Sequence, residues 1–265
     1  DAACALGSEM QFAGSWRRVG EPAGDVACFS LHPRKVVTVG DGGMLTTQDA
    51  ALDARFRLLR QHGMTVPDTV RHGSPQVILE SYDAVAFNYR LTDIQAAVGI
   101  EQLKRLPEIV SRRRALAERY RERIAAETPE VSAPVEPNRV RSNWQSYAVR
   151  LPDGVDQRQV MQSMLDDGVA TRRGIMCIHR EKPYADTARF PLPVSEAAQD
   201  RTILLPLYPQ YAAATTATAY DKAFEKLIKM RWQPAIRTAP SYHDHPLYIE
   251  LIAESIRSHL AQLDW

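Results

Sequence analysis

The sequence predicts an α/β protein, and three observations carry that prediction. Short apolar runs of strand length, bounded by Gly and Pro, lie at 26–30 and 43–47. Longer segments repeat apolar residues at helical spacing, most clearly over 107–126. The 265 residues are 45% hydrophobic and 25% charged, as in ordinary globular proteins, and this length suits one large domain or two smaller ones.

The first elements in order are the two strands and a helix. A loop broken by Pro33 and Gly40 separates the strands. Thr47 is expected to cap a helix over about 49–61, because apolar residues there fall on one side. The stretch 62–88, rich in turn residues, is expected to be irregular.

Two further helices are expected before residue 127. Residues 92–95, Thr-Asp-Ile-Gln, have the form of a capping box and open the first of them. Pro107 suits the first position of the second, which carries Ile109, Leu116 and Tyr120 at roughly helical spacing. The charged run at 112–114 is interpreted as the solvated face of this helix.

Prolines among polar residues at 127–143 predict a domain boundary, which gives a large domain over 1–130 and a smaller mixed domain over 131–209. The remainder, 210–265, is expected to be helical. The elements expected after the boundary are a strand at 144–151, a helix at 156–167, a strand or turn at 169–175, an irregular stretch around Pro183, Pro191 and Pro193, and helices at 219–230 and 246–263.

Charge and cysteine content exclude several classes of partner. Lys and Arg number 33 against 32 Asp and Glu, so a net charge of +1 gives no case for nucleic acid or an anionic membrane. No uncharged apolar run approaches the roughly 20 residues of a membrane helix, and no signal peptide opens the chain. The three cysteines lack CxxC spacing, which favours a reducing, cytoplasmic setting.

Lys35 is the first candidate for chemistry. The chain has 27 Arg but only 6 Lys, and Lys35 is the only lysine among the first 103 residues. It lies in the loop between two expected buried strands, where a lysine amine can form a Schiff base if a partly dry pocket keeps it neutral. The alternative is a solvated surface lysine.

Other candidates each have a plainer interpretation. Ser30 ends the preceding strand, where a hydroxyl binds phosphate or caps a turn. His32 is a general base or a packed turn residue. For Asp1, the functional interpretation is a carboxylate that faces the ring nitrogen of a ligand, and the plainer one is a mobile chain end. Asn88 and Arg90 grip a phosphate, or Arg90 forms a salt bridge. His243 and His245 resemble metal ligands only weakly, and the expectation is no metal site.

Taken in order, these segments resemble the DegT/DnrJ/EryC1/StrS family of sugar aminotransferases. The similar segments are 1–7, 28–35, 40–43, 87–97, 99–106, 168–172 and 204–209. The resemblance implies a fold-type-I enzyme dependent on pyridoxal 5′-phosphate, with a partial large domain followed by a small α+β domain. It also implies amino transfer from glutamate or glutamine to a nucleotide-linked keto-sugar.

The family pattern implies a role for each candidate residue. Lys35 corresponds to the Schiff-base lysine, Ser30 to a phosphate ligand and Asp1 to the carboxylate facing the pyridine nitrogen. Asn88 corresponds to a residue that reaches the cofactor phosphate of the neighbouring subunit, so a homodimer is expected. Cys4 departs from the His or Gln common at its position.

The segment from about 206 to 265 resembles ferrochelatase instead, so the chain is interpreted as a chimera. The matched segment ends before the metal-site His of that family, so iron insertion is not expected of it. Porphyrin binding is therefore the alternative function. Because the family's N-terminal part does not precede Asp1, we expect apolar strand edges or faces to be exposed and turnover to be low or absent.

Overall fold

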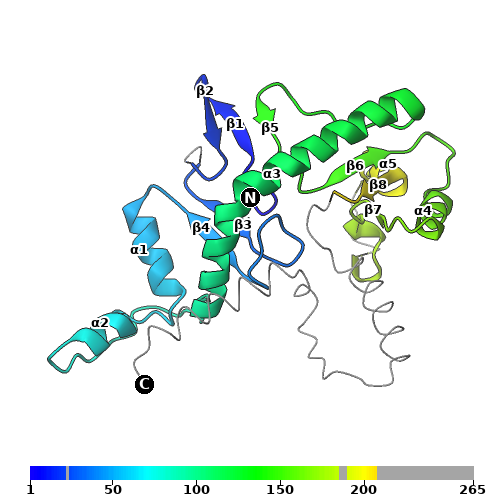
Figure 1. Ribbon diagram of the computed structural model, residues 1–265. Coiled ribbons are helices and arrows are strands. Elements are labelled where there is room, and N and C mark those ends of the chain that lie inside the picture. The colour runs from blue at the N-terminus through cyan, green and yellow to red at the C-terminus, as the bar shows by residue number, and fades with distance from the viewer. Residues whose placement is uncertain (22–23, 185–189, 208–265) are drawn as a thin grey trace, which may run out of the picture. The chain divides into compact units, whose positions relative to one another are not determined.

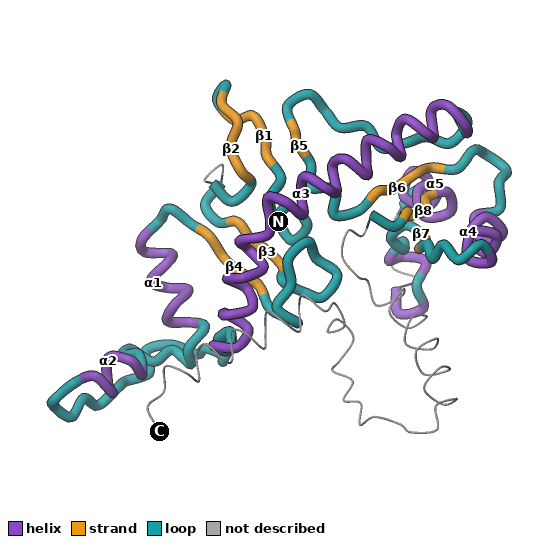
Figure 2. The backbone as a smooth tube through the Cα atoms, in the orientation of Figure 1, coloured by secondary structure: helices purple, strands orange, loops and turns teal. Residues whose placement is uncertain are grey.

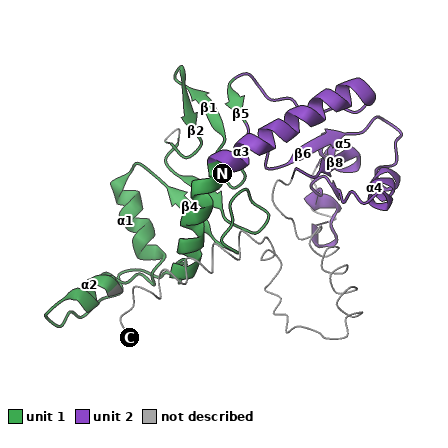
Figure 3. Ribbon diagram, viewed as in Figure 1, with its two compact units in different colours: residues 1–106, 139–141 green, residues 107–138, 142–265 purple. Residues whose placement is uncertain are grey.

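A computed structural model describes residues 1–21, 24–184 and 190–207 (Figure 1). The chain divides into two compact units (Figure 3). Unit 1 contains residues 1–106 and 139–141, and unit 2 contains residues 107–138 and those from 142 onward. The chain first passes from unit 1 to unit 2 at Pro107, inside one continuous helix. The sequence predicts a boundary near 130 instead. The expected helices of 210–265 lie outside the described residues.

Unit 1 opens with a hairpin that the sequence interpretation missed. Strands β1 (Glu9–Phe12) and β2 (Ser15–Arg18) pair antiparallel, and β5 (Val140–Arg141) joins the other edge of β1. Ala13 and Gly14 form the two-residue turn with φ of 49° and 81°. Positive φ at both central residues is the geometry that favours tight hairpins, and Gly14 is the signal in the sequence.

The expected strands at 26–30 and 43–47 are confirmed as β3 (Ala27–Ser30) and β4 (Gly43–Thr46). They form an antiparallel pair in which Ser30 lies opposite Gly43 and Ala27 opposite Thr46. The expected exposure of apolar strand residues is seen on β4, where Met44 is 49% and Leu45 47% exposed.

The first helix is shorter than expected and has a different cap. Helix α1 (Ala50–Leu59) follows Asp49, whose carboxylate accepts hydrogen bonds from the backbone N–H groups of Ala51 and Leu52. Thr47 instead donates its hydroxyl to the carbonyl of Asp25. The stretch expected to be irregular contains one short helix, α2 (Asp68–Gly73).

The two helices expected on either side of Pro107 form a single helix, α3 (Asp93–Glu127). The proline removes one internal hydrogen bond, to the carbonyl four residues earlier. Leu106, Ile109 and Val110 are all buried around it, and this packing offsets the lost bond. The capping box is confirmed: Thr92 Oγ1 accepts from Gln95 N at 3.3 Å, and Gln95 Oε1 accepts from Thr92 N at 3.1 Å.

Unit 2 contains a three-stranded antiparallel sheet in the order β6-β8-β7. Its core consists of Ala117, Tyr147, Val149, Leu151, Ile203 and Leu207, with Leu116, Tyr120 and Ile124 of α3 packed against them. The remaining elements are β6 (Tyr147–Arg150), α4 (Gln157–Asp166), β7 (Arg172–Arg173), two 3₁₀ turns at Ile178–Arg180 and Lys182–Tyr184, α5 (Pro193–Arg201) and β8 (Thr202–Leu205). Pro193 thus begins a helix in a stretch that was interpreted as irregular.

The arginine run of α3 is only partly a solvated face. Arg113 is 4% exposed and donates to the carbonyls of Trp144 and Gln145, the shortest of these bonds being 2.6 Å. Arg114 donates to the carbonyl of Ser142 at 2.9 Å. Only Arg112 matches the expectation, with a side chain 61% exposed. The other two donate to backbone carbonyls that are distant in sequence, and the residue pattern does not reveal those contacts.

Candidate functional site

Lys35 lies on the loop that joins β3 to β4, and the backbone of this loop is fixed by internal hydrogen bonds. Lys35 N donates to the carbonyl of His32 at 2.9 Å. Leu31 O accepts from both the N–H of Val39 and the hydroxyl of Thr38. Val36 and Val37 are 3% and 1% exposed, so the two residues after Lys35 are anchored in the core of unit 1.

The N-terminal end of α3, whose course is drawn in Figure 2, is hydrogen-bonded to the same loop. Gln95, which closes the capping box, donates its side-chain amide to the carbonyl of Asp41 at 2.8 Å. A Cβ on Gly99 would lie 3.1 Å from a methyl carbon of Val39, so this glycine allows the loop to approach the helix closely. The backbone that carries Lys35 is therefore constrained at both ends.

The Lys35 side chain is half-buried and reaches the N-terminal turn. Its Nζ donates to Cys4 Sγ at 3.0 Å. The turn lies against β3, because Ala2 N donates to the carbonyl of Cys28 at 3.0 Å. Sequence reasoning gave no signal for this thiol–amine contact, since the two residues are 31 positions apart.

Asp1 begins the turn whose fourth residue contacts Lys35. Its Oδ1 accepts from the N–H of Ala3 at 2.8 Å, and Ala5 N donates to the carbonyl of Ala2 at 2.9 Å. These bonds order the turn, and they fix one carboxylate oxygen of Asp1. A carboxylate has lone pairs for further donors, so Asp1 can also accept a bond from a ring N–H.

Ser30 closes β3 at the end nearest the Lys35 loop. Its Oγ accepts from the backbone N–H of His32 at 3.4 Å, a long contact that leaves the hydroxyl proton for another acceptor. His32 Nδ1 accepts from the N–H of Arg34 at 3.3 Å, as a turn residue does. Ser30, Lys35 and Cys4 thus belong to one connected region of unit 1.

Asn88 lies elsewhere in unit 1, on an exposed segment beside the end of α1. Tyr89 N donates to the carbonyl of Arg60 at 2.9 Å, and Asn88 forms an isolated bridge with Gln61. The side-chain oxygen of Asn88, Oδ1, accepts from Arg90 Nε at 3.5 Å. Among the residues that the structure describes, no hydrogen bond joins Asn88 to Lys35.

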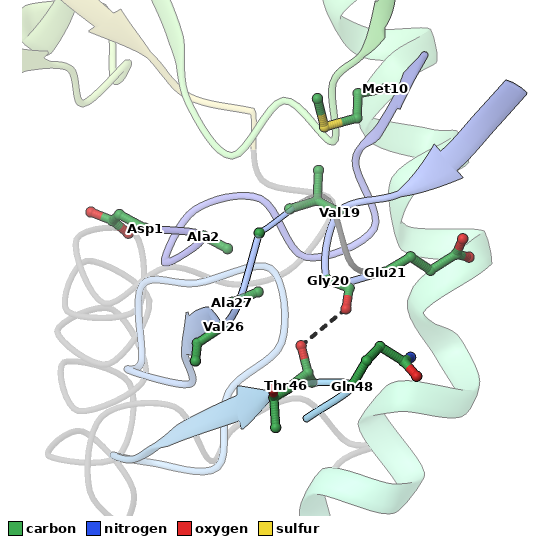
Figure 4. A pocket seen from close by; sticks show the side chains of 12 residues that line it. Asp1, Ala2, Met10, Val19, Gly20, Glu21, Val26, Ala27, Thr46 and Gln48 are labelled. Atoms are coloured by element: carbon green, nitrogen blue, oxygen red, sulfur yellow. Dashed lines mark hydrogen bonds between the residues drawn. The ribbon is translucent and has the colours of Figure 1, made fainter. Parts of the chain in front are cut away.

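A pocket of about 230 Å³ in unit 1 touches Asp1 but does not include the amine (Figure 4). Ala27 and Thr46 line it, and Thr46 donates its hydroxyl to the carbonyl of Gly20 at 3.1 Å. Ala27 and Thr46 face each other at the end of the β3–β4 pair opposite Ser30 and Gly43. The pocket therefore lies away from the loop of Lys35.

Within residues 1–21, 24–184 and 190–207, no three His, Cys, Asp or Glu side chains gather as a metal site would require. None of the helices in that part of the chain has the length and apolarity to cross a membrane. His243 and His245, weighed as weak metal ligands, lie outside the described residues, as does most of the ferrochelatase-like segment.

The sequence profile of the DegT/DnrJ/EryC1/StrS aminotransferase family matches residues 1–222. The chain belongs to this family. The resemblance inferred from the sequence motifs is thereby confirmed, and so is the α/β fold, because solved sugar aminotransferases superpose on the chain.

Among relatives, GDP-perosamine synthase from Caulobacter vibrioides is 35% identical over 187 residues, which are 70% of this chain and 48% of that protein. The aminotransferase TlmJ from Streptoalloteichus hindustanus has a TM-score of 0.66 at 29% identity, covering 86% of this chain and 58% of that one. DesV from S. venezuelae has a TM-score of 0.64 at 31% identity, covering 85% and 56%.

A second similarity covers a short segment of the chain at high sequence identity. Ferrochelatase from Rhizobium meliloti (strain 1021) is 64% identical over 72 residues, which are 27% of this chain and 21% of that enzyme. The chain spans less than two thirds of each of these relatives. The aminotransferase family covers far more of the chain than the ferrochelatase similarity does.

Pyridoxal 5′-phosphate is the cofactor of this family, in agreement with the cofactor expected from the motifs. The residues around Lys35 fit such a group chemically. They include an amine at Lys35, a carboxylate at Asp1 and a hydroxyl at Ser30, which are group types able to bind an aldehyde, a protonated ring nitrogen and a phosphate.

Proposed function

We propose that the chain acts as a pyridoxal-phosphate-dependent aminotransferase on a nucleotide-linked keto-sugar, with glutamate or glutamine as amino donor. The observation that carries the proposal is the reach of the half-buried Lys35 amine to the turn that Asp1 begins. Family membership supports the reaction class. Relatives named for GDP- and TDP-sugars support the substrate class.

In this proposal Lys35 Nζ is the catalytic amine. When bound, the cofactor supplies an aldehyde and an electron-accepting ring. Lys35 would hold the aldehyde end, and its free amine would move a proton at Nζ between the amino-bearing carbon of the substrate and the aldehyde carbon of the cofactor. Asp1 accepts a hydrogen bond from the ring N–H and keeps that nitrogen protonated, while the Ser30 hydroxyl donates to a phosphate oxygen.

The direct test is covalent trapping. The 265-residue chain is incubated with pyridoxal phosphate, reduced with borohydride and digested, and the pyridoxyl mass is located among the 6 lysines. We expect it on the peptide that contains Lys35 and not on that peptide in Lys35→Arg. Lys104→Arg, which removes an exposed helix lysine, is the matched control. Label on other lysines with none on Lys35 contradicts the site assignment.

We further propose that the chain works as a homodimer in which Asn88 serves the partner's site. The segment around Asn88 supports this, because Val85, Phe87 and Tyr89 are 94%, 58% and 72% exposed, and the last two rings stack at 5.2 Å. Exposed apolar patches of this kind mark protein contacts. Light scattering after size exclusion should give twice the mass of one chain, and Phe87→Asp should shift the protein toward monomer. A monomeric wild-type chain contradicts the proposal.

The low turnover expected for these 265 residues stays a prediction, as does a cytoplasmic location. An assay of transamination of GDP- or TDP-linked keto-sugars by the purified chain measures the turnover directly. Turnover comparable to that of a full-length relative, abolished by Lys35→Ala, would contradict low turnover while supporting the reaction class.

Porphyrin binding is a second candidate function, favoured by the 64% identity to ferrochelatase over 72 residues. Titration with protoporphyrin should give a saturable Soret shift if this segment binds porphyrin. Lys35→Ala should leave that shift unchanged. A linear, unsaturable response removes this candidate and leaves the aminotransferase proposal unaffected.

A further inference from the structure

The contact between Lys35 and Cys4 joins the two segments that carry the proposed catalytic groups. Lys35 Nζ donates to Cys4 Sγ at 3.0 Å, within the range of hydrogen bonds to sulfur. Lys35 lies between β3 and β4, and Cys4 lies three residues after Asp1. The amine is therefore tied to the turn that begins with the carboxylate.

Both ends of the contact are held by backbone hydrogen bonds. On the Cys4 side, Ala2 N donates to Cys28 O at 3.0 Å and Ala5 N donates to Ala2 O at 2.9 Å. On the Lys35 side, the backbone bond to His32 and the buried Val36 fix the start of the side chain. Only the four-carbon stem of Lys35 remains to be ordered, and the rotamer entropy of that stem opposes its ordering.

We propose that Cys4 is a positioning residue for Lys35, a role that rests on the proposed function of that lysine. The sulfur selects, among the rotamers of the stem, those that place Nζ beside the Asp1 turn. A thiol is a weak acceptor, so it orients the amine without holding it against the competing reaction with an aldehyde. A His or Gln, as is common at this position in the family, would offer a stronger acceptor.

The test measures how fast Lys35 is captured, without requiring turnover. The full chain is mixed with pyridoxal phosphate, quenched with borohydride at successive times, and the pyridoxyl group on the Lys35 peptide is quantified. Cys4→Ala should slow capture at Lys35 about threefold, less than the about fivefold that one ordinary hydrogen bond supplies, because the thiol is a weak acceptor. Cys4→Ser, whose hydroxyl also accepts, should stay within about twofold of wild type.

Cys28→Ala is the matched control, because Cys28 is also an exposed thiol and its contact with the turn uses only its backbone carbonyl. It should leave capture at Lys35 unchanged. Capture at Lys104 and Lys182 should be the same in all variants. Far-UV circular dichroism checks that each variant is folded.

Alkylation gives a second readout that needs no mutation of Cys4. In Cys28→Ser, iodoacetamide modifies Cys4, since Cys177 is buried. The added group occupies the space 3.0 Å from Nζ and should slow capture at Lys35 at least as much as Cys4→Ala. The same treatment should have no effect on the Cys4→Ala/Cys28→Ser double variant.

The outcomes separate this inference from the proposed function. Equal capture rates at Lys35 in wild type, Cys4→Ala and the alkylated protein overturn the role of Cys4 and leave Lys35 as the catalytic amine. Absence of label at Lys35 in the wild-type chain overturns the proposed function, and the role of Cys4 with it.

Discussion

The loop of Lys35 in unit 1 and the sheet of unit 2 are held in place by different forces. The loop adds a set of polar contacts to its buried Val36 and Val37, namely the backbone bonds at His32 and Leu31 and the side chain of Gln95 on the carbonyl of Asp41. The sheet depends on apolar packing around Tyr147 and Ile203, each 1% exposed. Polar contacts fix direction, and apolar burial supplies most of the free energy of folding.

This difference matters for a site that must exchange partners. A packed core resists any change of volume, whereas a loop held by hydrogen bonds can keep its backbone while one side chain moves. Lys35 has an anchored backbone and a side chain whose amine donates to a weak acceptor, Cys4 Sγ. Substitutions in the two regions should therefore differ both in size and in the quantity they change.

The largest effect is expected at Arg113, which joins the packed helix of unit 2 to the chain at 143–145. Arg113→Met should lower the free energy of unfolding by about 1.5–3 kcal/mol, because it removes a buried cationic donor from the part-buried carbonyls of Trp144 and Gln145. Urea unfolding measures this loss. Arg112→Met, on the exposed face beside it, should change stability by less than about 0.5 kcal/mol. Equal losses would show that Arg113 contributes only as part of the helix surface.

Two tyrosines of the unit 2 core should respond in opposite directions when the hydroxyl is removed. Tyr120 Oη donates to the carbonyl of Pro206 at 2.9 Å, so Tyr120→Phe should cost about 1 kcal/mol. Tyr147 Oη is buried with no partner among the described residues, and burial raises the pKa of this phenol. Tyr147→Phe should therefore stabilise by up to about 1 kcal/mol. Thermal unfolding of both variants compares them, and a loss at Tyr147 would indicate a partner beyond residue 207.

Variants of Gln95 test how much polar contacts contribute to holding the Lys35 loop. Gln95→Ala removes both the capping-box bond and the donor to Asp41, and should cost about 1 kcal/mol. Gln95→Glu keeps an acceptor for Thr92 N but loses the donor to Asp41. Hydrogen exchange over residues 36–42 should rise in both variants, while exchange over 147–150 in unit 2 stays unchanged. Faster exchange in Ala alone would show that the cap, and not the Asp41 bond, holds the loop.

The smallest effect is expected from Glu196, on the surface of unit 2. A hydrogen bond with His179, followed by one from Arg180, lowers the pKa of Glu196 from its ordinary 4.5. Because the folded-state pKa is lowered, its contribution is present above pH 4.5 and is lost as the pH falls through the lowered value. Glu196→Gln should flatten the dependence of the urea midpoint on pH in that acidic range. The exposed Glu130→Gln should retain the wild-type slope.

Features set by neighbouring residues could be predicted from the sequence. The capping box at 92–95 and the strands that became β3 and β4 appear in the structure close to where the residues indicated. Pro107 and Pro193 were misjudged, because the same residue breaks, begins or interrupts a helix according to what packs around it. The hairpin of β1 and β2 was missed, although Gly14 marks its turn.

The order of motifs by itself determined the family of this chain and the candidate residues Lys35, Ser30, Asp1 and Asn88, because motif order depends on the residues alone. Only the tertiary structure decided that Arg113 is buried on carbonyls 30 to 32 positions away, and that the Lys35 amine meets Cys4 across 31 positions. Such contacts depend on how the backbone folds back on itself. Local propensity and spacing carry no information about which distant atoms that folding brings within hydrogen-bond distance.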